Sequence, residues 1–145
     1  MPAAERPALT EYLFHTPITT RWSDNDIYGH INNVTYYSYF DSAANRYLIE
    51  VGGLDISRGG VIGLVVESGC TYHAPLSYPT PLVAGMRVDR LGNRAVTYGM
   101  AIFAEGETLA AAHGHFVHVF VDRVTRKPVA IPPLLRDALA RLVPA

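Results

Sequence analysis

The chain has 145 residues, of which 49% are hydrophobic, so it is long enough to bury one core without disulfides or a structural metal. Its net charge of -1 excludes a global field that would attract nucleic acid, and its single cysteine, Cys70, excludes an internal disulfide. No stretch approaches the roughly 18 apolar residues of a membrane helix and the start has no signal-peptide pattern, so we expect a cytoplasmic protein without membrane partners.

The first predicted element is a strand in FHTPITTRWS, residues 14–23, which is rich in threonine and aromatic residues. A helix follows over 34–51, because apolar side chains recur there at helical spacing: Tyr36, Phe40, Ala43, Ala44, Tyr47, Leu48 and Val51. Gly52 and Gly53 then end the helix, since glycine favours the backbone conformation that closes a helix.

Beyond the helix the apolar pattern changes to period two, which is typical of strands. Four strands are predicted, over 61–75, 81–92, 93–107 and 108–122, with a tight turn at Gly106 and Glu107. In the first of these strands, alternation assigns one face to Ile62, Leu64, Val66, Cys70, Tyr72 and Ala74. A short helix over 133–142 begins at a Pro-Pro pair, because proline suits a first helical turn.

The order of these elements predicts an α+β fold in one domain, 1–145, whose first ~12 residues are expected to be flexible. Strands joined by short turns pair antiparallel, and a largely apolar helix before such a sheet is best buried on its concave face. We therefore expect a curled antiparallel sheet of about five strands wrapped round one long helix. The fifth strand is apolar on both faces and open sheets have edges to protect, so we expect a homodimer or homotetramer.

The densest polar chemistry lies in RWSDNDIYGHINN, directly before the long helix. This stretch starts like a calcium-binding loop, but Tyr28 and Thr35 stand where that loop needs Asp or Asn and a bidentate Glu, which excludes calcium. A second interpretation is structural: Asp24 and Asn32 make turns and cap the helix. That interpretation explains these two residues better than it explains Asp26.

A third interpretation of the same stretch is catalytic, and it is compatible with the second. The helix is expected to begin at Asn33 or its neighbour, where free N–H groups can stabilise developing negative charge. Asp26 could then act as a general base on water or as a nucleophile. Gly29 would allow a tight turn with room for a substrate carbonyl, and His30 could orient a group or donate a hydrogen bond. Spacing alone names no substrate.

The stretch RWSDNDIYGHINNVTYYSYFDSAANRYL resembles the signature of hot-dog-fold acyl-CoA thioesterases of the hydroxybenzoyl-CoA thioesterase type. Their pattern is roughly D-x-D-x-x-G-H-x-N-N followed by an aromatic-rich helix. The resemblance continues through CTYHAPLSYPTPL and VDRVTRKPVAIP. It implies the hot-dog fold, hydrolysis of an acyl-CoA thioester, and two subunits joined into one continuous sheet. It also implies that Asp26 is the catalytic carboxylate and that the N–H of Asn33 polarises the thioester carbonyl. The supporting motif positions are Asp24, Gly29, His30 and Asn32.

If the substrate is an acyl-CoA, its nucleotide should stay at the surface, because burying unpaired phosphates would cost on the order of several kcal/mol. Arginine suits bidentate phosphate contacts. The candidates lie at strand ends and turns: Arg90, Arg94, Arg123 and Arg126. For each of them a solvated surface position is the alternative. Gly29 and Asn32 are also expected to contact the substrate, and no cofactor is expected apart from the coenzyme A of the substrate itself.

Three further polar features have structural alternatives. His113 and His115 share a strand face while His118 points the other way, so we expect no metal site. Glu67 is either a second catalytic carboxylate or a residue that faces solvent or pairs at an interface. Cys70 is expected to be a small core residue and not a nucleophile, because it lies inside an apolar strand.

Several functions are compatible with these residues. The first is an acyl-CoA thioesterase, and the alternatives are a non-catalytic acyl-CoA-binding module and a thioesterase for acyl-carrier-protein thioesters. A pure binder has no need for a carboxylate such as Asp26 at the thioester. An enoyl-thioester hydratase is disfavoured, because the motif lacks a His-x-x-x-x-Pro arrangement. The acyl group is undefined, since Tyr36, Tyr37 and Tyr39 suit an aromatic pocket, a fatty-acyl pocket or core packing.

Overall fold

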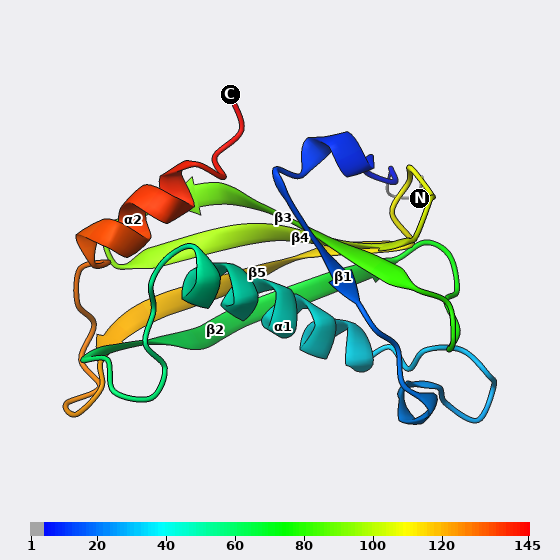
Figure 1. Cartoon of the computed structure of the whole chain (residues 1–145), viewed down its shortest axis with the longest axis horizontal. Coiled ribbons are helices and arrows are strands. Elements are labelled where there is room, and N and C mark those ends of the chain that lie inside the picture. The colour runs from blue at the N-terminus through cyan, green and yellow to red at the C-terminus, as the bar shows by residue number, and fades with distance from the viewer. Residues whose placement is uncertain (1–4) are drawn as a thin grey trace.

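The computed structural model describes residues 5–145, which form one five-stranded antiparallel sheet with two α-helices and two short 3-10 helices (Figure 1). The strands are β1 Phe14–Ile18, β2 Val61–Tyr72, β3 Leu82–Leu91, β4 Ala95–Ala104 and β5 Ala112–Asp122. The helices are α1 Thr35–Glu50, α2 Pro133–Ala140, η1 Leu9–Glu11 and η2 Trp22–Asp24. The order across the sheet is β1-β3-β4-β5-β2, and all neighbours pair antiparallel, as predicted.

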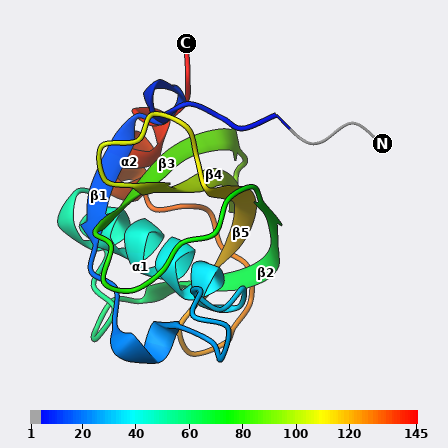
Figure 2. The ribbon, with the colours of Figure 1, turned by 90° about the vertical axis from the view of Figure 1, so that its right-hand side faces the viewer.

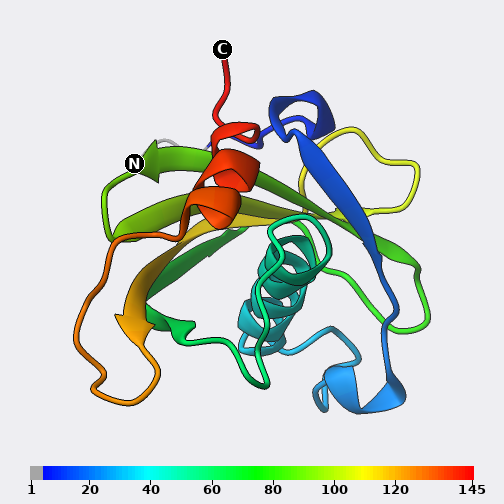
Figure 3. The same cartoon turned by 60° about the vertical axis from the view of Figure 1, so that its left-hand side comes forward.

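The sheet curls round α1, which lies along its concave face (Figures 2 and 3). The apolar stripe predicted for the helix is the buried one, with Phe40, Ala44 and Leu48 fully buried. Burying a side chain such as Phe40 or Leu48 contributes roughly 1.5–3 kcal/mol, so this stripe holds the helix against the sheet. Val51, also expected in the core, is 38% exposed, because it follows the last helical residue and Gly53, with φ of 70°, turns the chain away.

Strand β2 contains an irregularity that the alternation pattern did not predict. Its register with β5 shifts between Val65 and Glu67. As a result Leu64 pairs with Val119, whereas Cys70 pairs with Gly114 on the opposite face of β5. The predicted common face was therefore wrong, because one extra residue puts Leu64 on the outer, convex face of the sheet while Cys70 faces the core.

Strands β1 and β2 form the two edges of the sheet, and the apolar exposed edge is β2. Strand β5, whose two apolar faces led us to expect an oligomer, lies between β4 and β2 and is not itself an edge. On β2, by contrast, Leu64, Val65 and Val66 are 36%, 49% and 60% exposed. An unpaired apolar edge promotes pairing with another strand, so the expectation of an oligomer now depends on β2.

The two ends of the described chain pack on the sheet. The predicted C-terminal helix is confirmed as α2, and the Tyr47 hydroxyl on α1 donates a hydrogen bond to the Ala138 carbonyl. The flexibility expected of the first ~12 residues stays a prediction; within residues 5–12, Arg6 Nε donates to the Ala110 carbonyl at 2.8 Å and Tyr12 is 4% exposed. The rest of that expectation concerns residues 1–4, which lie outside the described chain.

The turn before β5 lies one residue earlier than predicted. The Glu107 N–H donates to the Ala104 carbonyl at 3.0 Å, so Glu105 and Gly106 are its central residues, and Gly106 has φ of 88°. Within residues 5–145, no helix has the length and apolar character needed to cross a membrane. A curled antiparallel sheet wrapped round one long helix is the hot-dog fold, which confirms the predicted architecture.

Candidate active site

The loop between β1 and α1 is anchored by the buried carboxylate of Asp24, which is 2% exposed. Its Oδ2 accepts hydrogen bonds from the Arg21 N–H at 2.9 Å and from the Tyr39 hydroxyl at 2.7 Å. Its Oδ1 lies 3.2 Å from Nη2 of Arg21. Burial alone would raise the pKa of Asp24, but the hydrogen bonds from Tyr39 and Arg21 together hold that pKa below its usual value. Asp24 is therefore a charged anchor whose oxygens are satisfied.

This anchor is connected to the start of α1 through Asn32. The Asp24 carbonyl accepts a hydrogen bond from the Asn32 N–H at 2.9 Å. The Asn32 carbonyl then accepts the Thr35 N–H at 2.9 Å. Oδ1 of the Asn32 side chain lies 3.4 Å from the Val34 nitrogen. The turn-forming roles predicted for Asp24 and Asn32 are both present. The cap residue of the helix is Val34, which makes no side-chain cap of its own.

Asp26, Gly29 and His30 share one tight turn next to this anchor. Oδ1 of Asp26 accepts the N–H groups of Tyr28 at 2.8 Å and His30 at 3.4 Å, and the Asp26 N–H donates to the His30 carbonyl at 2.8 Å. Gly29 has φ of 83°, where a side chain would strain the backbone, and its carbonyl accepts the Ser77 hydroxyl at 2.8 Å. Oδ2 of Asp26 has no hydrogen-bond partner within residues 5–145 and stays available for chemistry.

Two cavities adjoin this turn. The first, of about 500 Å³, is lined by Trp22, Ser23, Asn25, Asp26, Ile27 and Gly29. The second, of about 320 Å³, lies between the start of α1 and the end of β2 and is lined by His30, Ile31, Asn33, Tyr36, Tyr72, His73, Ala74 and Pro75. Asp26 and Asn33 thus lie in different cavities, and the backbone pairing of Asp26 with His30 links one lining residue of each. The N–H of Asn33 finds no acceptor in the described chain.

Two tyrosines form one side of the second cavity: Tyr36, which the sequence suggested for an acyl pocket or for core packing, and Tyr72, which sequence reasoning had not linked to the site. The Tyr72 hydroxyl donates to the Asn33 carbonyl at 2.8 Å, and the Tyr72 ring packs edge-on against Tyr36 with centroids 5.1 Å apart. Burial raises the pKa of Tyr36 to about 12, so its hydroxyl stays neutral. The contact between Tyr72 and Asn33 joins distant parts of the chain and leaves no local signal in the sequence.

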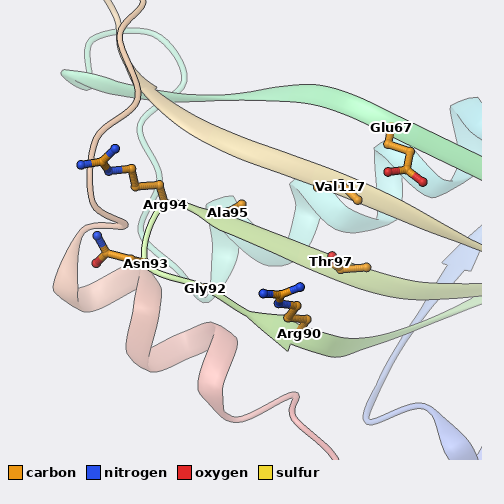
Figure 4. Close-up of a pocket in the computed structure, with 8 residues that line it drawn as sticks. All are labelled: Glu67, Arg90, Gly92, Asn93, Arg94, Ala95, Thr97 and Val117. Carbon is orange, nitrogen blue, oxygen red and sulfur yellow. The ribbon is translucent and has the colours of Figure 1, made fainter.

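Two of the four arginines predicted to bind phosphate lie at the far end of the sheet. Arg90 and Arg94 belong to the β3–β4 hairpin, and they line a cavity of about 540 Å³ on the outer face (Figure 4). The lining residues are Glu67, Arg90, Gly92, Asn93, Arg94, Ala95, Thr97 and Val117. This hairpin lies beside the start of β2, since Ala95 and Leu64 both pair with Val119. The Asp26 turn adjoins the other end of β2, so these two arginines do not reach it within one protomer.

The other two arginines follow β5, at the same far end. The side chain of Arg123 donates to the backbone carbonyls of Gly59 and Ile56, so its guanidinium holds the loop before β2. Arg126 is exposed in the turn after β5 with φ of 63°. Arg126 therefore remains available for an anion, whereas much of the hydrogen-bonding capacity of Arg123 is already used.

Glu67 and Cys70 do not belong to the Asp26 turn. The side chain of Glu67 is 66% exposed on the outer face of the sheet, so it faces solvent as one alternative predicted, and it accepts a hydrogen bond from Nε2 of His115 of the same protomer at 3.0 Å. Cys70 is partly buried against the core, and burial raises the pKa of its thiol to about 11. At neutral pH Cys70 is protonated and a poor nucleophile.

The histidines of β5 are divided between the two faces of the sheet, as the alternation predicts. His113 contacts His73 with 2.7 Å between Nδ1 and Nε2, whereas His118 contacts the Tyr98 hydroxyl at 2.9 Å in the core. Burial lowers the pKa of His118 to about 4, so it is neutral at physiological pH. No cluster of three or more His, Cys, Asp or Glu side chains suited to a metal occurs in residues 5–145.

Comparison with known proteins agrees with this architecture. No curated protein sequence matches the chain significantly. Among solved structures, the PA5185 protein from Pseudomonas aeruginosa strain PAO1 is 59% identical with a TM-score of 0.96, over 97% of this chain and 99% of that chain. A predicted thioesterase from Bacillus stearothermophilus is 27% identical with a TM-score of 0.76, over 91% and 98%.

More distant structures share the fold alone. Slr0204, a 1,4-dihydroxy-2-naphthoyl-CoA thioesterase from Synechocystis, is 17% identical with a TM-score of 0.78, over 88% of this chain and 95% of that chain. The model of the thioesterase-like superfamily matches residues 20–139, which include the Asp26 turn, α1 and strands β2 to β5. The chain therefore belongs to the thioesterase-like superfamily.

Proposed function

We propose that the protein hydrolyses an acyl-CoA thioester to a free carboxylic acid and coenzyme A. Membership of the superfamily and the likeness to the Bacillus thioesterase support thioester hydrolysis. The single observation that carries the mechanism is the 2.8 Å backbone hydrogen bond between Asp26 and His30. Asp26 lines one cavity, and its hydrogen-bond partner His30 lines the second, which also contains the free N–H of Asn33; this supports a joint role for the two groups.

In the proposed reaction the thioester carbonyl lies against the Asn33 N–H, which donates to the oxygen as negative charge develops there. The free Oδ2 of Asp26 either takes a proton from an attacking water or attacks the carbonyl carbon itself. In both routes the carbon–sulfur bond breaks and the thiolate of coenzyme A leaves and is protonated. In the second route water then hydrolyses the acyl-aspartyl anhydride. His30 lines the same cavity as Asn33 and can donate a second hydrogen bond.

The same proposal includes a homodimer, or a tetramer made of two such dimers. The exposed apolar edge of β2 supports this assembly, because two-fold pairing of identical edges makes antiparallel strands. In Figure 1 this edge runs along the lower side of the sheet. Antiparallel pairing would bring the start of one β2 next to the end of the other. The open second cavity at Tyr72 would then face the Val61 end of the neighbouring strand.

This pairing also offers a position for the coenzyme. In one protomer Arg90, Arg94 and Arg126 lie far from Asp26, at the end of the sheet where β2 begins. In the proposed dimer that end of the partner approaches the second cavity. We therefore propose that the acyl end of the substrate reaches Asp26 of one subunit while its phosphates contact Arg90 and Arg94 of the partner subunit at the surface.

The test compares the wild type with Asp26→Asn on a panel of aromatic and aliphatic acyl-CoA thioesters, with released thiol measured continuously. We expect Asp26→Asn to keep its fold, because an amide oxygen can still accept the Tyr28 N–H, and to lose at least ~100-fold in turnover. Asp41→Asn is the matched control, because Asp41 is an exposed carboxylate on α1 outside both cavities.

Binding can be followed separately from turnover through Trp22, the single tryptophan, which lines the cavity of Asp26. We expect its emission to change when Asp26→Asn protein binds an acyl-CoA. Near-normal turnover by well-folded Asp26→Asn would contradict the role of Asp26. A wild type that binds every thioester of the panel without releasing thiol would instead be a non-catalytic acyl-CoA-binding module. If only acyl-carrier-protein thioesters were hydrolysed, the substrate class would be these and not acyl-CoA.

A further inference from the structure

The hydroxyl of Tyr72 bonds to the residue that leads into α1. Tyr72 ends β2, and its hydroxyl donates to the Asn33 carbonyl at 2.8 Å. We propose that Tyr72 is a positioning residue, which holds the N–H of Asn33 in the orientation needed to polarise the thioester carbonyl. The inference rests on the proposed function, and it assigns a role in that site to a residue on the edge strand.

The backbone on both sides of the Asn33 Cα is hydrogen-bonded, but not equally. A peptide unit is planar, so a bonded carbonyl also fixes the direction of the N–H in the same unit. The peptide unit before this Cα consists of the Asn32 carbonyl and the Asn33 N–H. Its carbonyl accepts the Thr35 N–H at 2.9 Å. The N–H of that unit is the group left without an acceptor in the described chain, so it is held ready for a substrate.

The unit after the Asn33 Cα depends mainly on Tyr72. Its carbonyl accepts the Tyr72 hydroxyl at 2.8 Å, whereas its N–H, from Val34, has only the 3.4 Å contact with Asn32 Oδ1. Removal of the hydroxyl would therefore leave the carbonyl of this second unit without that hydrogen bond and loosen the turn that contains the Asn33 N–H. Because the direction of a donor decides its value in the transition state, loosening this segment should reduce turnover more than substrate binding.

The hydroxyl is carried by a rigid support. Tyr72 pairs with Ala112 of β5, and the next residue, His73, donates its N–H to the Ala111 carbonyl at 2.8 Å. The Tyr72 ring also packs edge-on against Tyr36, which is 3% exposed in the first turn of α1. The hydrogen bond thus connects the sheet to the start of the helix. A site built on such elements is held more exactly than one built on a loop alone.

The experiment uses the full-length protein and the acyl-CoA that it hydrolyses fastest. Tyr72→Phe keeps the ring and removes the hydroxyl, and we expect kcat to fall about 10- to 100-fold while KM stays within about twofold. The matched control is Tyr47→Phe, which also removes a tyrosine hydroxyl bonded to a backbone carbonyl, that of Ala138, but at the other end of α1. It should lose thermal stability without a comparable loss of kcat.

Three outcomes separate the inference from the proposed function. A tenfold or larger fall in kcat for Tyr72→Phe, with Tyr47→Phe near wild type at equal or lower stability, supports positioning. Equal kcat in wild type and Tyr72→Phe, or equal losses in both variants, overturns the inference while Asp26→Asn, run alongside, still reports on the proposed function. A wild type without thioesterase turnover overturns both.

Discussion

Replacing Tyr39 by phenylalanine removes one hydroxyl from the interior and tests whether Asp24 anchors the catalytic loop. Tyr39 is 6% exposed, and its hydroxyl lies 2.7 Å from Oδ2 of Asp24. A hydrogen bond to a charged group contributes about 1.5–3 kcal/mol, and Asp24 keeps its contacts with Arg21 in the variant. We expect a loss of about 2 kcal/mol in the free energy of unfolding at pH 7, which lowers Tm by roughly 4–8 °C.

The loss should depend on pH, because the acceptor is a carboxylate. The pKa of Asp24 is lowered in the folded state, so the stability that its charged form contributes is fully present above the unfolded value of about 3.9. That contribution disappears as the pH falls through the folded pKa. Wild type and Tyr39→Phe should therefore differ most at neutral pH and converge as the pH falls well below about 3.9.

The measurement is urea unfolding followed by circular dichroism at several pH values and one fixed chain concentration, since assembly would couple stability to concentration. Tyr28→Phe serves as the control, because the Tyr28 side chain is exposed and lies outside the Asp24 hydrogen bonds. Equal urea midpoints for wild type and Tyr39→Phe at pH 7 would refute the anchoring role. A difference that stayed constant down to low pH would show that the acceptor is not the charged form of Asp24.

Two further predictions concern assembly and the coenzyme. Light scattering should give a mass of at least twice that of the 15.9 kDa chain. Val66→Lys on the exposed edge of β2 should shift this mass toward that of the monomer. A wild-type mass of only 15.9 kDa at micromolar concentration would refute the edge pairing. The KM for an acyl-CoA should rise with ionic strength while kcat changes little, and the double replacement Arg90→Ala and Arg94→Ala should act likewise. Equal efficiency with an acyl-pantetheine at every salt concentration would show that the arginines do not bind the nucleotide.

Local determinants made much of the fold and of the candidate site predictable. The spacing of Phe40, Ala44 and Leu48 predicted both α1 and its buried face, because residues three and four apart lie on one side of a helix. The turn around Gly29 was predictable for a similar reason, since a positive φ is a property of that residue and its neighbours. The roles proposed for Asp26 and Asn33 remain predictions that the experiments above address.

Alternation along β2 led to a wrong face because it assumes an uninterrupted strand. The register shift between Val65 and Glu67 depends on how β2 pairs with β5, and nothing within the apolar run around Val66 marks it. The same limit applies to the oligomer. The two apolar faces of β5 suggested an oligomer but could not show which strand lies at an edge, and in the structure that strand is β2, not β5.

The sequence by itself determined the element order, the buried stripe of α1 and the polar turn that contains Asp26, because these depend on neighbours within one segment. Only the tertiary structure decided that β2 is an edge strand, that Arg90 and Arg94 lie at the far end of the sheet, and that Tyr72 reaches Asn33. The physical reason is that periodicity reports which residues of one element are buried together. Strand order and side-chain hydrogen bonds depend instead on pairings between segments that are distant in the chain, and those pairings form only when the sheet closes round the helix.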